Sequence, residues 1–199
     1  MIAILSFGKL DSIKFSASIN SFGILIEPSY DIDTIISPNI NLKESFLCYS
    51  KFIYIIMEHV AIMRKSWRLV PKILTRQKKI ESRWYKTKYP PWDKIKKGET
   101  VYFKDSGEPV TVKTKVDKVV QISDINPKKV KEILNKYAKP DGLGINEIPK
   151  FYEIFKDKKY CILIFLKNPE KIKPFNIDKS GFGSMCSWIS KEDINEIRT

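Results

Sequence analysis

The chain of 199 residues is long enough for one domain with a substantial core and too short for two domains of average size. Hydrophobic residues make up 43% of it and aromatic residues 12%, which excludes an intrinsically disordered protein. The formal net charge of +13 favours a polyanionic partner, and we expect nucleic acid rather than an acidic membrane surface. The alternative is a Lys-rich surface without a specific partner, because net charge governs association and solubility rather than fold.

The cysteines and histidines give no sign of a metal site. Cys48, Cys161 and Cys186 are widely spaced and form no CxxC pair, and His59 is the only histidine. We therefore expect no metal, no cofactor and no disulfide. No apolar run approaches the roughly 20 residues of a membrane span, and the first residues lack the features of a secretory signal, so we expect a cytoplasmic protein.

The composition changes near Met57. Residues 1–56 contain four Lys or Arg and five Asp or Glu, whereas the other 143 residues contain 32 and 18. The short apolar runs before Met57 have no sustained period of two or 3.6, so they predict no domain. We expect residues 1–56 to be either a poorly structured extension or a segment assigned from too early a start, and the abrupt change at Met57 favours the second. The folded domain is predicted over residues 57–199.

The first predicted elements after Met57 are short. Residues 58–63 predict a strand, and residues 66–77 can supply a helical turn or two with Pro71 in the first turn. A further strand is predicted over residues 80–85, with Trp84 in the core. The clearest hairpin follows, because two alternating runs flank the turn signal "DSGEP". Its predicted core face holds Val101, Phe103, Val110, Val112 and Val116, and its opposite face holds Tyr102, Lys104, Lys113 and Lys115.

The second half adds helices and a buried strand. Residues 126–139 predict a helix with Asn126 as the N-cap, and residues 148–155 predict a second, shorter one. Residues 159–166 are apolar enough for a strand that is buried on both faces, and residues 191–197 predict a last helical turn. Five or six strands with short helices predict an α+β fold, a small mixed barrel and not a doubly wound sheet.

Glu81 is the one acid in the basic stretch "QKKIESRWYKTKYPPW". Alternation along residues 80–85 places Glu81 and Arg83 on the face opposite Trp84 and Ser82. With Lys78 and Lys79 nearby, the carboxylate is expected to stay ionised and to orient Arg83. The alternative is a surface ion pair worth less than about 1 kcal/mol.

The segment "RQKKIESRW" resembles the GxKxxExR signature of ASCH domains, a branch of the PUA-like β-barrels. Lys78, Glu81 and Arg83 stand on the lysine, glutamate and arginine of the motif, and "WDKIKKGETVYFKDSG" resembles the segment that follows it. The resemblance covers roughly residues 58–197 and is strongest to stand-alone archaeal members. One departure is Arg76, which stands where the signature has Gly and puts the tightness of that turn in question.

The ASCH resemblance implies a PUA-like mixed barrel, closed or nearly closed, with short peripheral helices and a cleft lined by the signature residues. It also implies a role in RNA binding or RNA-linked chemistry. Cations interleaved with aromatic residues agree with this, because single-stranded RNA is held by basic side chains and by stacking of its bases. Trp92, after a double proline, is expected to be exposed in a loop. The expected contacts to RNA, a nucleotide or a modified nucleoside are Lys78, Glu81, Arg83, Tyr85, Trp92, Lys104 and Ser187.

The resemblance leaves two other functions open. Some bacterial ASCH proteins are amidohydrolases acting on acetylcytidine, and in their pattern a threonine stands where this chain has Glu81, so the nucleophilic hydroxyl is missing. Such an enzyme would use Lys78 to stabilise an oxyanion and Glu81 as a base on water, although nearby cations oppose the raised pKa that a base needs. Ser82 is expected to point away from this group. The other function is non-specific association with RNA through basic charge, and a specific binding module is favoured over both.

Overall fold

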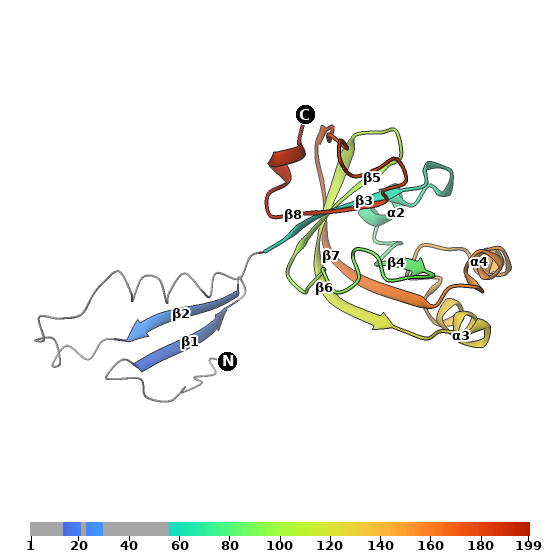
Figure 1. Cartoon of the computed structure of the whole chain (residues 1–199), viewed down its shortest axis with the longest axis horizontal. Coiled ribbons are helices and arrows are strands. Elements are labelled where there is room, and N and C mark those ends of the chain that lie inside the picture. Colours follow the sequence, from blue (N-terminus) through green and yellow to red (C-terminus); the bar gives the residue numbers. More distant parts are fainter. Residues whose placement is uncertain (1–13, 21–22, 30–55) are drawn as a thin grey trace, which may run out of the picture. The chain divides into compact units, whose positions relative to one another are not determined.

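The computed structural model describes residues 14–20, 23–29 and 56–199. The chain divides into two units, Met1–Tyr54 and Ile55–Thr199. In the first unit, the described residues form an antiparallel hairpin of β1 (Lys14–Asn20) and β2 (Gly23–Ser29), drawn in blue in Figure 1. Residues 1–13, 21–22 and 30–55 of the predicted extension, with Cys48 among them, lie outside the described residues.

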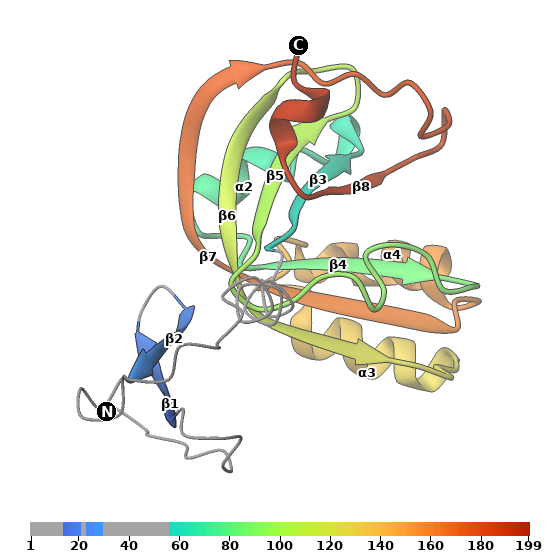
Figure 2. The ribbon, with the colours of Figure 1, turned by 60° about the vertical axis from the view of Figure 1, so that its left-hand side comes forward.

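The second unit is built on a six-stranded mixed sheet in the order β4-β7-β6-β5-β3-β8. Its strands are β3 (Glu58–Met63), β4 (Ile80–Tyr85), β5 (Thr100–Asp105), β6 (Val110–Ile122), β7 (Tyr160–Phe175) and β8 (Trp188–Lys191). Only the β3–β5 pair is parallel among the described pairs. Figure 2 shows the long strands β6 and β7 bending, so that the sheet curls into a half-barrel. Register shifts at three places between β6 and β7 accompany the bend, as bulges commonly do.

This architecture confirms the predicted α+β, PUA-like fold with about six strands and short helices. Of the expected closed or nearly closed barrel, full closure is not found in the described residues, because β4 and β8 end the sheet without pairing to each other. The hairpin of β5 and β6 has the predicted core face, with Val101, Phe103 and Val112 fully buried. β7 runs nine residues past the predicted end at Leu166, through half-exposed and charged positions whose pattern did not indicate a strand.

The helices are α2 (Val70–Leu74), α3 (Pro127–Tyr137) and α4 (Ile148–Phe155), and Ile194–Ile197 form a 3-10 turn. α3 begins as predicted, because the side chain of Asn126 accepts a hydrogen bond from the backbone N–H of Lys129 at 2.9 Å. Figures 1 and 2 show α3 and α4 lying side by side near β4 and one end of β6 and β7. None of the helices in the described part of the chain is long and apolar enough to cross a membrane.

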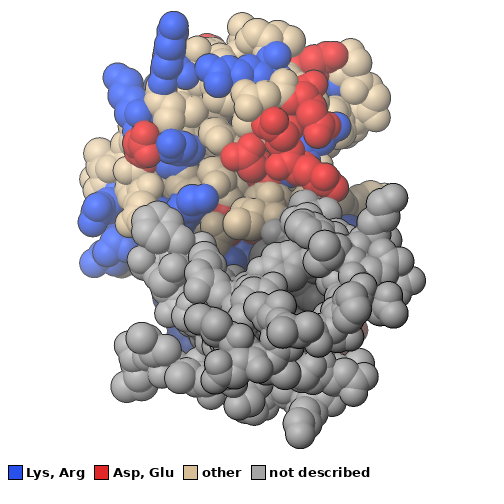
Figure 3. Space-filling model, turned by 90° about the vertical axis from the view of Figure 1, so that its left-hand side faces the viewer, with Lys and Arg blue, Asp and Glu red and all other residues tan. Residues whose placement is uncertain are grey.

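The surface charge of the second unit is uneven. Figure 3 shows one face on which many Asp and Glu side chains gather in one area, with Lys and Arg side chains mainly on the other side of that face. The large positive charge of the sequence therefore does not by itself define a binding surface, which has to be argued from particular residues.

Candidate functional site

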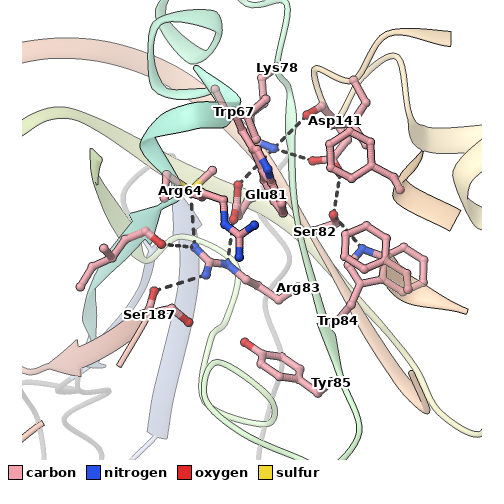
Figure 4. A pocket seen from close by; sticks show the side chains of 16 residues that line it. Arg64, Trp67, Lys78, Glu81, Ser82, Arg83, Trp84, Tyr85, Asp141 and Ser187 are labelled. Carbon is pink, nitrogen blue, oxygen red and sulfur yellow. Dashed lines mark hydrogen bonds and ion pairs between the residues drawn. The ribbon is translucent and has the colours of Figure 1, made fainter. Parts of the chain in front are cut away.

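A pocket of about 170 Å³ lies along β4, the edge strand that carries Glu81 and Arg83 of the signature. Figure 4 shows its lining. One part of the wall is apolar and largely aromatic: Trp67, Leu69, Trp84, Leu143, Phe151 and Phe155. The polar part consists of Arg64, Lys78, Glu81, Ser82, Arg83, Asp141 and Ser187. The structure thus brings together five of the seven predicted ligand contacts: Lys78, Glu81, Arg83, Tyr85 and Ser187.

The turn before Lys78 has a positive φ at Arg76, the position at which the ASCH signature has glycine. Arg76 has a φ of 58°, in the left-handed region that favours glycine. An arginine pays roughly 1–2 kcal/mol for this conformation. The backbone N–H of Lys78 then bonds the carbonyl of Lys72 at 2.9 Å, so the departure from the signature leaves a tight turn and changes only the side chain.

Lys78 is the centre of a buried charge cluster. Its Nζ donates to Asp141 Oδ1 at 2.5 Å and to the Asp141 carbonyl at 3.0 Å, and it lies 3.1 Å from Glu81 Oε2. Burial alone would lower the pKa of Lys78, but the two carboxylates outweigh burial and raise it. Two of these contacts are hydrogen bonds to Asp141, and the third is a charge contact with Glu81. Lys78 therefore links the two acids of the cluster.

Glu81 pairs with Arg83 as predicted, but the pair is buried. Arg83 Nε lies 2.7 Å from Glu81 Oε1, and the side chains are 12% and 3% exposed. The alternative of a weak surface ion pair is therefore wrong. Of the three cations expected near Glu81, Lys78 and Arg83 form ion pairs with it, whereas Lys79 is exposed and lines a different pocket. Glu81 Oε2 and Arg83 Nε make charge contacts without a well-directed hydrogen bond, so both keep hydrogen-bonding capacity.

Arg83 also reaches across the pocket. Its Nη1 donates to the carbonyl of Ser187 at 3.3 Å and its Nη2 to the carbonyl of Ile62 at 3.5 Å. Its guanidinium lies over the ring of Trp188, 5.3 Å from the centroid. These contacts are long, so the planar group is oriented while its N–H groups are incompletely used.

The prediction that Ser82 points away from the site is wrong. Its Oγ lines the pocket, donates to Asp141 Oδ2 at 2.5 Å and accepts the indole N–H of Trp84 at 3.0 Å. The reason is that β4 is an edge strand, so a pocket against its free edge is reached by side chains from both faces. The placement of Trp84 itself was predicted correctly, since its ring stacks on Phe155 with centroids 4.7 Å apart.

Asp141 is the site residue that the sequence did not indicate. It stands in "KPDGLG", where Asp before Gly is ordinary turn chemistry, and it is 63 residues from Lys78. Burial raises the pKa of Asp141, and Lys78 opposes this only in part because Glu81 adds a second negative charge. The carboxyl of Asp141 therefore takes up a proton more readily than an ordinary aspartate does.

Two predicted contacts lie elsewhere. Trp92 is buried instead of exposed, because its ring packs edge-on against Tyr160 at 5.3 Å. Lys104 is also buried, on β5 in the interior of the sheet and outside the pocket, and burial together with Lys179 lowers its pKa. The exposed aromatic residue near the site is Tyr89, whose ring lies 6.5 Å from that of Tyr85.

Tyr85 has a defined place in the pocket wall. Its hydroxyl donates to the carbonyl of Pro90 at 2.9 Å. Burial raises the pKa of Tyr85 to about 12, with Arg83 opposing the shift. Tyr85 therefore stays a neutral phenol at physiological pH and offers its ring rather than a charge.

The described residues contain no group of three His, Cys, Asp or Glu side chains placed to hold a metal ion. His59 is fully buried, with Nε2 2.9 Å from Glu99 Oε2, as expected for a structural histidine. Cys161 and Cys186 are both free thiols.

No protein-family profile and no curated protein matches the sequence. The structure is similar to that of ASCH from Zymomonas mobilis, with a TM-score of 0.49 and 16% identity over 66% of this chain and 85% of the other. A Tyr-to-Phe mutant of that protein gives 0.49 and 15% over 66% and 88%. A Ser-to-Ala mutant gives 0.48 and 14% over 66% and 86%. These three similar structures are all structures of an ASCH protein.

Proposed function

We propose that the protein binds RNA or a nucleotide by taking a single base into the pocket along β4. The observation that carries this proposal is the pairing of an aromatic wall with the Glu81–Arg83 ion pair in one small pocket. A volume of about 170 Å³ is below the roughly 300–1,000 Å³ of sites for drug-sized ligands, so it suits one ring system. The ASCH resemblance of the signature residues implies the same class of ligand.

The polar groups suit recognition of a base edge. A carboxylate accepts hydrogen bonds from exocyclic amines and ring N–H groups, and a guanidinium donates to carbonyl oxygens. Glu81 Oε2 and the incompletely used N–H groups of Arg83 supply these two functions next to each other. Trp67 and Phe151 meet edge to face at 5.2 Å in the apolar wall and offer a surface for stacking.

Arg64 adds a cation to the pocket. Its guanidinium lies over the ring of Trp67, 5.1 Å from the centroid, and no ion pair to a carboxylate is found for it among residues 56–199. Because Lys78, Glu81, Arg83 and Asp141 neutralise one another, Arg64 makes the pocket positive on balance. A net positive pocket attracts a nucleotide more than a neutral base.

Equilibrium binding of the full chain to a panel of nucleosides, nucleotides and short RNAs tests the proposal. Glu81→Gln and Arg83→Lys should each weaken binding by tenfold or more, since the first removes the carboxylate that accepts from a base and the second removes the planar guanidinium that donates to it. Glu132→Gln on the exposed side of α3 is the matched control and should bind as the wild type does. Wild-type binding by both pocket variants would refute the assignment of the site.

The non-specific alternative is separated by a salt series. Binding through charge alone loses affinity uniformly with salt and ignores the sequence of the RNA. A base held in a pocket leaves a preference among bases that persists as salt is raised. A complete loss of that preference would favour the non-specific alternative.

A second candidate function, amide hydrolysis, is favoured by the hydrogen bond from Ser82 to Asp141. In this reaction Ser82 Oγ attacks the carbonyl carbon of the substrate while its proton passes to Asp141, and the departing amine takes that proton as the carbon–nitrogen bond breaks. Water then hydrolyses the acyl-serine. The raised pKa of Asp141 suits a base, whereas Glu81 and Lys78 are engaged with each other and with Arg83 and Asp141.

Incubation with acetylcytidine distinguishes the two functions. An enzyme should release acetate, lose turnover in Ser82→Ala and keep it in Ser180→Ala, an exposed serine outside the pocket. Binding without turnover at high protein concentration would leave the binding function alone.

A further inference from the structure

A second pocket, of about 260 Å³, lies on the other side of the signature turn. Its polar lining consists of Arg76, Lys78, Lys79, Lys167 and Asn168, completed by Ile73, Leu166 and Pro169. None of the lining residues is Asp or Glu. Lys78 lines this pocket and the one along β4, so the two pockets are neighbours.

The cations of this second pocket are not neutralised by the protein. Arg76 and Lys79 are exposed, and within residues 56–199 neither forms an ion pair with a carboxylate. Lys167 lies 3.4 Å from Asp117, and both side chains are about half exposed, so this pair is weak. Of the three positive charges of Arg76, Lys79 and Lys167, only that of Lys167 therefore has a carboxylate nearby, whereas the charges of the first pocket largely cancel.

The backbone of the pocket is also unusual. Arg76 has a φ of 58° and Asn168 a φ of 50°, so two non-glycine residues of one pocket adopt the left-handed conformation. Glycine and asparagine tolerate this conformation, whereas an arginine that adopts it is strained. Backbone strain of this kind clusters at binding sites. A strained arginine in this turn therefore suggests that its side chain takes part in binding.

We propose that this second pocket binds a phosphate group of single-stranded RNA, next to the base held along β4. Arg76, Lys79 and Lys167 are the groups that meet the phosphate, since arginine and lysine are the side chains that bind it best. The identification of RNA as the source of the phosphate rests on the proposed function. The phosphate site itself does not depend on it. A single strand fits, because a base and a backbone phosphate are then offered by the same flexible chain.

The sharpest test is Arg76→Gly in the full chain, compared with Arg68→Gly. Both arginines are exposed and both have a positive φ, 58° and 50°, so each change removes one charge and relieves the same strain. Arg68 lines neither pocket. Arg76→Gly should fold at least as stably as the wild type yet bind an eight-nucleotide single-stranded RNA about tenfold more weakly. The slope of log affinity against log salt should fall by about 0.7, the value for one phosphate contact with a single strand. Arg68→Gly should change neither quantity.

Three ligands separate the possible outcomes. Nucleosides without phosphate report on the pocket along β4, inorganic phosphate reports on the second pocket, and the RNA reports on both. Loss of RNA and phosphate binding in Arg76→Gly, with nucleoside binding unchanged, would support both proposals. The same loss in a protein that binds no nucleoside would support the phosphate site and refute the base pocket. Equal loss in Arg76→Gly and Arg68→Gly, or no loss in either, would overturn the phosphate site.

Discussion

Arg83 Nη1 donates to the carbonyl oxygen of Ser187 at 3.3 Å, which joins edge strand β4 to the residue that precedes edge strand β8. Nη2 extends this link to the carbonyl of Ile62 in β3. Because β4 and β8 do not pair through their backbones, this side chain connects the two ends of the curled sheet at the pocket. One residue thus shapes the pocket and, in the proposed function, also supplies a group for its ligand.

Arg83→Lys should loosen this connection although it keeps the charge. A lysine cannot contact Glu81, Ser187 and Ile62 at once, because it lacks the planar fork. We expect a loss of about 1–2 kcal/mol in the free energy of unfolding. Hydrogen exchange at the amide of Ile62, which bonds the same Ser187 carbonyl at 3.0 Å, should become faster.

Arg198→Lys is the control for this prediction. Arg198 lies over the ring of Phe175, 4.4 Å from the centroid, and lines neither pocket. Arg198→Lys should leave the hydrogen-exchange rate of the Ile62 amide unchanged. If Arg83→Lys also left that rate unchanged, Arg83 would not hold the two edges together.

Lys78→Met should strongly destabilise the protein at pH 7. It leaves Glu81 and Asp141 buried with only Arg83 to balance them, and removing one partner of a buried ion pair costs about 3–5 kcal/mol. The loss should shrink as the pH falls from 7 to 5. Burial already raises the pKa of Asp141, so this group binds its proton more tightly in the folded state than in the unfolded state, and its contribution to the free energy of unfolding increases as pH decreases.

Urea unfolding across this pH range measures the effect. The double variant Lys78→Met with Asp141→Asn should be more stable at pH 7 than Lys78→Met alone, because one uncompensated charge is gone. A single variant as stable as the wild type at pH 7 would show that Lys78 does not hold the cluster together.

Local patterns in the sequence were enough to predict the helices and strands whose periodicity is visible within a short segment. The alternation of residues 80–85 and the 3.6-residue period of α3 predicted a strand and a helix at the observed places. The four residues of β8 carry no such pattern, and they form a strand only because they pair with β3. Tertiary pairing decided that element, and local periodicity does not encode it.

In the site too, contacts between residues close in sequence could be predicted, and contacts between distant residues could not. Lys78, Glu81 and Arg83 lie within six residues of one another, so spacing was sufficient to predict that Glu81 and Arg83 meet. Asp141 reaches the cluster through a turn far along the chain, and no local pattern marks that contact. Trp92 was misplaced because a loop position argued for exposure, whereas the large apolar area of the ring is buried against Tyr160.

Gly142→Ala should disturb the cluster through the residue next to Asp141. Gly142 has a φ of 81°, and an added Cβ would lie 3.0 Å from the Cβ of Lys78. The strain alone costs about 1–3 kcal/mol, and crowding against Lys78 should add to it and weaken nucleoside binding. Gly181→Ala provides the comparison, because its φ is 82° with no atom within 4 Å of the added Cβ. Thermal unfolding should show a larger loss for Gly142→Ala, and equal losses would mean that the contact with Lys78 is unimportant.

His59 should titrate in the folded protein at a lower pH than histidine normally does. Burial lowers its pKa from the ordinary 6.5, although Glu99 and Glu58 oppose the shift. The indole N–H of Trp188 donates to Nδ1 at 3.3 Å, so Nδ1 carries no proton and Nε2–H donates to Glu99. Ser190 Oγ, 2.9 Å from Nδ1, completes the polar surroundings of the ring.

Since His59 is the only histidine, its ring protons give one unambiguous NMR signal. In the folded chain this signal should titrate at a lower pH than in urea, where it should titrate near 6.5, the ordinary value. The unfolded state therefore binds a proton that the folded state does not, so the free energy of unfolding has its full value above pH 6.5 and decreases as the pH falls toward the lowered pKa. A folded-state midpoint at 6.5 or higher would show that Glu99 outweighs burial, and stability would then not decrease with pH over this range.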